Sequence, residues 1–187
     1  MRITTGKYKG RVLRMPLRIR PTQDKVRKAI FDILGDVEGL TFLELFAGSG
    51  AVGFEALSRG VRELVLAESD RECQLAIKRN IELLRPRNCL LYPHAAEKVI
   101  PFLKKEKRVF DLVFLDPPYY KSKHAESLTK KTLQILNSYD ILAPCGFIIA
   151  QHSKKDELPK ESGELVLVKE ARYGDTALSF YRKQCAK

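Results

Sequence analysis

Short apolar runs alternate with apolar residues at helical spacing along most of the chain. The runs predict strands and the helical periods predict helices. The predicted strands are residues 41–46, 63–67, 89–92, 110–115, 147–150, 165–169 and 177–182. The predicted helices are residues 26–34, 51–58, 71–84, 95–103 with an interruption near Pro101, and 124–136. This alternation predicts an α/β fold with a mostly parallel sheet covered on both faces, and the last two strands predict an antiparallel addition at one edge.

The first residues differ from this pattern. Residues 3–19 alternate loosely between apolar and polar side chains and contain two glycines, which predicts a small β-hairpin. No acidic residue occurs from Met1 to Gln23, within a chain whose formal net charge is +11. Such a one-signed segment is typical of an arm that contacts nucleic-acid phosphates, although a solvated basic face is the competing interpretation. We therefore divide the chain into a basic arm, residues 1–20, and an α/β domain, residues 21–187.

The composition fits one globular domain. Hydrophobic residues make up 44% and charged residues 30% of the 187 residues. No apolar stretch is long enough to span a membrane and the start has no signal-peptide core, so we expect a cytoplasmic protein. The four cysteines lie far apart without a CxxC pair, so we expect reduced thiols and no metal site. A monomer is the expected oligomeric state.

A glycine-rich loop follows the first strand of the predicted domain. Residues 44–53 contain the pattern G-x-G-x-x-G between a strand and a helix. Small residues there let the backbone approach a ligand, and Glu68, about twenty residues further on, can hold both hydroxyls of a ribose. The loop alone fits NAD as well as S-adenosylmethionine (SAM), and a tight structural turn is the other interpretation. Glu44 favours SAM, because a carboxylate suits its cationic end better than a pyrophosphate.

The segment Asp116-Pro117-Pro118-Tyr119 follows the strongly apolar strand 110–115. Ligands bind at the carboxyl ends of strands in open α/β sheets. The prolines stiffen the turn and remove two N–H donors, so the Asp116 carboxylate and the Pro117 carbonyl can act together as acceptors. Two acceptors can hold the hydrogens of an exocyclic base amine and stabilise the charge that develops on nitrogen, while Tyr119 stacks on the base. The competing interpretation is a proline turn capped by Asp116.

Several segments together resemble a known family. They are Arg20-Pro21-Thr22-Gln23-Asp24-Lys25-Val26-Arg27, Phe46-Ala47-Gly48-Ser49-Gly50-Ala51, Glu55-Ala56-Leu57-Ser58-Arg59-Gly60, Asp116-Pro117-Pro118-Tyr119 and Tyr173-Gly174-Asp175-Thr176. In this order, over nearly the whole chain, they resemble the bacterial small-subunit (16S) ribosomal RNA guanine-N2 methyltransferases of the RsmD type.

The resemblance implies a Rossmann-like SAM-dependent methyltransferase fold, with a mostly parallel seven-stranded sheet, one antiparallel edge strand and a small N-terminal hairpin. It implies methylation of one guanine N2 in small-subunit ribosomal RNA of an assembling subunit, with S-adenosylhomocysteine as product. The expected catalytic residues are Asp116, Pro117, Pro118 and Tyr119. The expected cofactor contacts are Glu44, Phe46, Ala47, Gly48, Ser49, Gly50, Glu68, Ser69, Ala95 and Asp116. The expected RNA contacts are Arg2, Lys7, Lys9, Arg11, Arg14, Arg20, Thr22, Arg27 and Tyr119.

Two positions depart from the family pattern. His94 stands where an Asp or Asn usually precedes the Ala, and Gln151-His152-Ser153 stands where acidic residues are expected. We expect surface or helix-capping roles for both histidines.

Other functions stay open. A DNA or RNA adenine-N6 methyltransferase needs the same acceptor geometry, but 187 residues show no separate target-recognition region. An RNA-binding assembly factor could keep this fold without activity. An NAD-dependent oxidoreductase would explain the glycine loop but not the segment that begins at Asp116.

Overall fold

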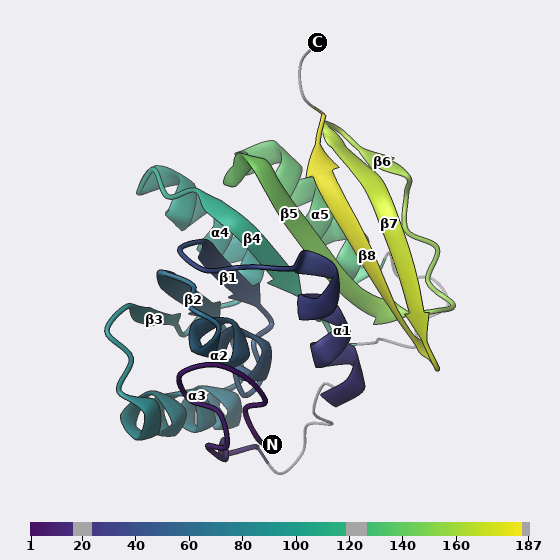
Figure 1. Cartoon of the computed structure of the whole chain (residues 1–187). Coiled ribbons are helices and arrows are strands. Elements are labelled where there is room, and N and C mark those ends of the chain that lie inside the picture. Colours follow the sequence, from purple (N-terminus) through teal and green to yellow (C-terminus); the bar gives the residue numbers. More distant parts are fainter. Residues whose placement is uncertain (17–23, 119–126, 185–187) are drawn as a thin grey trace. The chain divides into compact units, whose positions relative to one another are not determined.

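The structure is a computed structural model that describes residues 1–16, 24–118 and 127–184. It consists of two compact units, Met1–Ala95 and Ala96–Lys187 (Figure 1). The boundary lies inside the predicted domain 21–187, and the described part of the basic arm belongs to the first unit. Within the described ranges, no helix combines the length and the apolar character needed to cross a membrane.

Three short parallel strands form the centre of the first unit. They are β1 (Thr41–Leu45), β2 (Glu63–Ala67) and β3 (Cys89–Tyr92), and β2 pairs with both of the others. The helices of this unit are α1 (Asp24–Leu34), α2 (Ala51–Ser58) and α3 (Arg71–Leu84). Every residue of β1 is buried, as expected for a parallel strand covered on both faces. Helix α2 contacts β1 and β2, and α3 contacts β3.

The basic arm is a loop fixed on α2. Among the described residues of the arm, Arg2 and Val12 form a single antiparallel bridge, so the predicted hairpin is reduced to this pair. At Gly6, φ is 78°, and a Cβ there would lie 1.7 Å from the carbonyl oxygen of Ser58. The Lys7 N–H donates to the same oxygen at 2.8 Å. Backbone contact therefore attaches the arm to α2, and Figure 1 shows the purple N-terminal loop beside α2 and α3.

The second unit has five strands in the order β4-β5-β8-β7-β6. They are β4 (Phe110–Leu115), β5 (Leu142–Ser153), β6 (Glu161–Ser162), β7 (Leu165–Tyr173) and β8 (Thr176–Lys183). Its helices are α4 (Ala96–Lys105) and α5 (Leu128–Tyr139), which contact each other. Strands β4 and β5 are parallel, whereas β8 is antiparallel to both β5 and β7. The antiparallel strand predicted at the edge therefore lies inside the sheet, and the two-residue β6 forms that edge.

The predicted elements occur, together with the unpredicted strand β6, and three of them differ clearly from their predicted form. Helix α4 continues through Pro101, because burial of Val99, Ile100 and Leu103 offsets the hydrogen bond that proline cannot make. Strand β5 is much longer than the predicted 147–150, and its pairing with β4 shifts register between residues 110 and 112 of β4. Helix α5 begins at Leu128, and its predicted start at residue 124 lies outside the described residues.

The prediction of a surface role for His152 is wrong. The residue is buried in β5, with Nε2 2.9 Å from the Ser179 hydroxyl of β8 and Nδ1 2.9 Å from the Ser153 carbonyl oxygen. Burial lowers the pKa of His152 below its usual value, because charging the ring would require desolvating an imidazolium. His152 therefore stabilises the pairing of β5 and β8. His94 is exposed directly after β3, as predicted.

Candidate cofactor and base sites

The glycine-rich loop joins β1 to α2 and has an open side and a packed side. At Gly48, φ is 57° and no heavy atom lies within 4 Å of the place that a Cβ would take. At Gly53, by contrast, a Cβ would lie 2.6 Å from Glu44 Oε2 and 2.6 Å from the Leu64 side chain. Bare backbone therefore faces open space at Gly48, while Gly53 lets α2 pack closely on the strands. Both features are typical of a nucleotide-binding loop.

Two buried carboxylates hold this loop through backbone hydrogen bonds. Glu44 Oε2 accepts the Gly53 N–H at 2.8 Å in the first turn of α2, where a negative charge is favourable. Glu68 Oε2 accepts the Gly48 N–H at 2.7 Å, and its Oε1 accepts the Asp70 N–H at 2.8 Å. Each carboxylate oxygen has two lone pairs. Glu68 can therefore fix Gly48 and still accept a hydrogen bond from a ligand hydroxyl.

Phe46 begins the loop with a strained backbone. Its φ is 57°, in the left-handed region that costs a non-glycine residue about 1–3 kcal/mol. Neighbouring backbone bonds hold the turn: the Ala47 N–H donates to the Ala67 carbonyl of β2 at 3.1 Å, and the Gly50 N–H donates to the Ala47 carbonyl at 2.7 Å. Strain of this kind persists where the surroundings fix it, and it clusters at ligand sites.

The other predicted cofactor residues of the first unit lie near the same strand ends. Ser49 is buried in the loop, and Ser69 is exposed directly after Glu68. Ala95 is half-buried and follows His94 beyond the end of β3. The first unit thus brings every predicted cofactor residue except Asp116 to the carboxyl ends of its parallel strands.

Asn80 of α3 joins the glycine loop to the basic arm, and the sequence analysis did not identify it. It is fully buried, and its Oδ1 accepts the Arg14 N–H at 2.7 Å. Its Nδ2 donates to the Arg14 carbonyl and to the Ser49 carbonyl, both at 3.1 Å. One side chain therefore holds the arm and the loop together. Its signal in the sequence is a polar residue at helical spacing with the buried Ile77 and Leu84.

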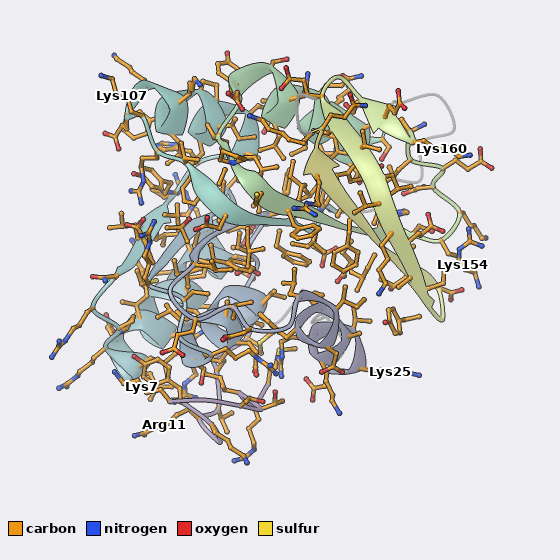
Figure 2. All side chains as sticks on the ribbon, turned by 45° about the horizontal axis from the view of Figure 1, so that its top comes forward. Lys7, Arg11, Lys25, Lys107, Lys154 and Lys160 are labelled. Atoms are coloured by element: carbon orange, nitrogen blue, oxygen red, sulfur yellow. The ribbon has the colours of Figure 1, made fainter. Side chains whose placement is uncertain are left out.

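The predicted RNA contacts of the arm are mostly exposed. Figure 2 shows Lys7 and Arg11 projecting outward from the arm. The exposed members of the set are Arg2, Lys7, Lys9, Arg11 and Arg14. Arg20 and Thr22 lie outside the described residues, and so does Tyr119.

Arg27 does not fit the RNA contact that was predicted for it. It is 1% exposed, and its Nη2 donates to the Arg2 carbonyl oxygen at 2.7 Å and lies 3.1 Å from Asp24 Oδ1. Its Nε lies 3.6 Å from Oε2 of the buried Glu55, which also accepts the Thr4 N–H at 2.9 Å. A guanidinium enclosed in this way cannot reach a phosphate. Arg27 instead links the arm, α1 and α2.

In the second unit, Asp116 is paired with a side chain of the neighbouring strand. It follows β4 directly, and the register that pairs Leu115 with Ala150 places Asp116 beside Gln151 of β5. Gln151 Nε2 donates to Asp116 Oδ2 at 2.7 Å. Gln151 is 6% exposed, and its Oε1 has no hydrogen-bond partner among the described residues. Of the two prolines that follow Asp116, the first is buried and the second is exposed.

Solved structures share this fold over almost the whole chain. The putative methyltransferase yhhF from Escherichia coli has a TM-score of 0.82 and 27% identity, and the match covers 98% of each chain. The hypothetical protein TTHA0928 from Thermus thermophilus has a TM-score of 0.83 and 31% identity, covering 97% of this chain and 99% of that chain. SMU.776, a putative methyltransferase complexed with SAH, has a TM-score of 0.68 and 16% identity, covering 87% of this chain and 50% of that one. The fold is the Rossmann-like fold of methyltransferases, as predicted.

Curated relatives and a family model identify the family to which the chain belongs among proteins with this methyltransferase fold. The model described as Conserved hypothetical protein 95 matches residues 1–182. The putative rRNA methyltransferase YlbH from Bacillus subtilis is 36% identical, covering 98% of this chain and 100% of that protein. Ribosomal RNA small subunit methyltransferase D from Escherichia coli K12 is 30% identical, covering 98% and 90%. The chain belongs to the Conserved hypothetical protein 95 family, which includes methyltransferase D, and the predicted resemblance is confirmed.

Proposed function

We propose that this protein transfers a methyl group from SAM to the N2 amino group of one guanine in small-subunit ribosomal RNA. The observation that carries the proposal is the pair formed by Asp116 and Gln151, which presents acceptors directly beyond a parallel strand. Relatives named as ribosomal RNA methyltransferases support the RNA substrate. The family resemblance alone supports the guanine N2 position.

The first unit has the features that SAM requires. SAM, when bound, supplies an electrophilic methyl group on a positively charged sulfur. The open backbone at Gly48 leaves room for a close ligand, and Glu68 would accept hydrogen bonds from the ribose hydroxyls. Glu44 would place its negative charge near the cationic end of the cofactor. The half-buried Phe46 and the exposed Ser69 would border the same ligand.

The residues that begin at Asp116 would bind the target amine. The Asp116 carboxylate and the Pro117 carbonyl would hold its two hydrogens and orient the nitrogen lone pair toward the methyl group. The amine nitrogen would become positively charged as it is methylated, and the Asp116 carboxylate would accept the proton that the nitrogen then releases. A fixed carboxylate stabilises that developing charge. Tyr119 would stack on the base, as proposed from the sequence.

The exposed arm would bind the RNA backbone. Its cations are Arg2, Lys7, Lys9, Arg11 and Arg14. Cations that neutralise phosphates make binding strongly dependent on salt and position the protein without reading sequence. The proposed partner is an assembling small ribosomal subunit in the cytoplasm, and the protein would act on it as a monomer.

Transfer of labelled methyl from SAM tests the proposal. The acceptors are small ribosomal subunits from cells that lack this activity, large subunits, and duplex DNA. We expect label in the small-subunit RNA alone. Transfer to DNA would favour the adenine-N6 alternative, and SAM binding measured by calorimetry without transfer to any RNA would favour an assembly factor. Binding of NADH in preference to SAM would favour an oxidoreductase.

A further inference from the structure

Gln151 carries a buried acceptor that has no donor among the described residues. The residue is 6% exposed, its Nε2 donates to Asp116 Oδ2 at 2.7 Å, and its Oε1 has no partner in the described part of the chain. An ionised carboxylate can only accept hydrogen bonds, so the amide must turn its nitrogen toward Asp116 and its oxygen away. Buried polar atoms without partners are rare in folded proteins, and each calls for an explanation.

The strand register places this acceptor beside the carboxylate that would bind the amine. Leu115 pairs with Ala150 in the parallel ladder, so Asp116 and Gln151 follow at neighbouring strand ends. On its other side Gln151 pairs with Leu178 of β8. The backbone of Gln151 is thus paired with β8 and directly follows the last residue paired with β4, and its side chain is held by Asp116. Oε1 is therefore a fixed acceptor next to Asp116.

We propose that Gln151 Oε1 accepts the ring N1–H of the target guanine while Asp116 holds its N2 amino group. This inference rests on the proposed function. In guanine, the ring atom N1 beside the amine carries a hydrogen and is a donor. In adenine and cytosine, the ring nitrogen beside the amine carries no hydrogen and is an acceptor. Neighbouring acceptors at Asp116 and Gln151 therefore match the amine and the N1–H of guanine. The ring nitrogen of adenine or cytosine would instead place an acceptor against Gln151 Oε1, which repels it.

The test compares two bases at the mapped target position of reconstituted small subunits. One particle carries guanosine there and the other carries 2-aminopurine, which keeps the N2 amine but has an acceptor at N1. The wild-type protein should prefer guanosine by about tenfold to a hundredfold in kcat/KM, because the analogue leaves a buried acceptor facing another acceptor. Mass analysis of the digested RNA identifies the product.

A variant without the acceptor shows whether Gln151 causes this preference. Gln151→Met has a similar shape but lacks both the acceptor and the N–H group that donates to Asp116. Loss of the donor affects both particles alike, so the ratio of their kcat/KM values reports the acceptor, and this ratio should fall by about tenfold or more. Thermal unfolding and SAM affinity show whether the variant is folded. If Gln151→Met is unstable, Gln151→Leu takes its place.

The outcomes distinguish this inference from the proposed function. An unchanged preference in a folded Gln151→Met protein would overturn the role of Gln151 while leaving guanine methylation intact. If the wild-type protein transfers no methyl group to guanosine in these particles, the proposed function itself fails.

Discussion

The two units hold the carboxylates of their candidate sites in different ways. In the first unit, Glu44 and Glu68 accept hydrogen bonds from backbone N–H groups of the glycine loop. In the second unit, Asp116 accepts from the side chain of Gln151, whose oxygen has no partner among the described residues. Backbone donors are fixed by the fold, so the loop is organised before any ligand binds. The pair at Asp116 is completed by a donor that the base would bring.

This difference predicts separate consequences for mutation. A change at a loop carboxylate removes a partner from the backbone and should weaken cofactor binding together with local structure. A change at Asp116 should leave the cofactor loop intact and act on the reaction of the bound base.

The largest effect is expected for Asp116→Ala. Loss of the group that stabilises developing charge should lower kcat by about a hundredfold to a thousandfold. The affinity for SAM, measured by calorimetry, should change by no more than about twofold, since the backbone bonds of the glycine loop remain. Turnover at the wild-type rate would remove Asp116 from the mechanism.

A smaller effect, on the affinity for SAM more than on kcat, is expected for Glu68→Gln. The amide has one neutral acceptor in place of two charged ones, so either the Gly48 or the Asp70 N–H loses its acceptor and the other keeps an uncharged one. The Kd for SAM should rise by about tenfold to a hundredfold, and kcat at saturating SAM should fall much less than in Asp116→Ala. Glu82→Gln, at an exposed position on α3, is the matched control. A normal SAM affinity in Glu68→Gln would show that the loop does not depend on this carboxylate.

The sequence predicted the parts of the site that local patterns encode. A strand, a glycine turn and a helix are contiguous, so the loop and Glu68 could be placed from spacing alone. The position of Asp116 at the end of a strand could be predicted in the same way. The roles of Asn80 and Gln151 could not be predicted from the sequence, because their partners Arg14 and Asp116 lie 66 and 35 residues away.

Two further details depended on packing. The family resemblance implied an RNA contact for Arg27 of α1, but it could not show that this side chain turns inward toward Glu55. Apolar patterning predicted β4, β5, β7 and β8 of the second unit, but neither the short β6 nor the position of β8 between β5 and β7. Pairing order depends on which faces pack together, and that information is not contained in any one strand.

Asn80→Ala tests the connection between the arm and the loop. The change leaves the Arg14 N–H without its partner and removes the donor to Ser49. The free energy of unfolding should fall by about 1–3 kcal/mol in urea titrations, and the Kd for SAM should rise severalfold. Asn88→Ala is the control, because the exposed Asn88 donates a hydrogen bond to the Arg62 carbonyl, away from the arm. An unchanged SAM affinity would show that Asn80 supports the arm alone.

The smallest effects are expected for single charges of the arm. Lys9→Gln and Arg11→Gln should each weaken RNA binding modestly and reduce the salt slope of binding by about 0.7–0.9. SAM affinity should not change. Lys160→Gln, at an exposed lysine of the second unit shown in Figure 2, is the control. An equal loss in the control would show that net charge, and not the arm, determines binding.

The identity of the methylated nucleoside, established by chromatography against standards together with its mass, tests the central claim most directly. Small subunits from cells lacking this activity are incubated with the protein and labelled SAM, and their RNA is digested to nucleosides. The account predicts that the label appears in N2-methylguanosine, at one position of the small-subunit RNA. Label in N6-methyladenosine would contradict it.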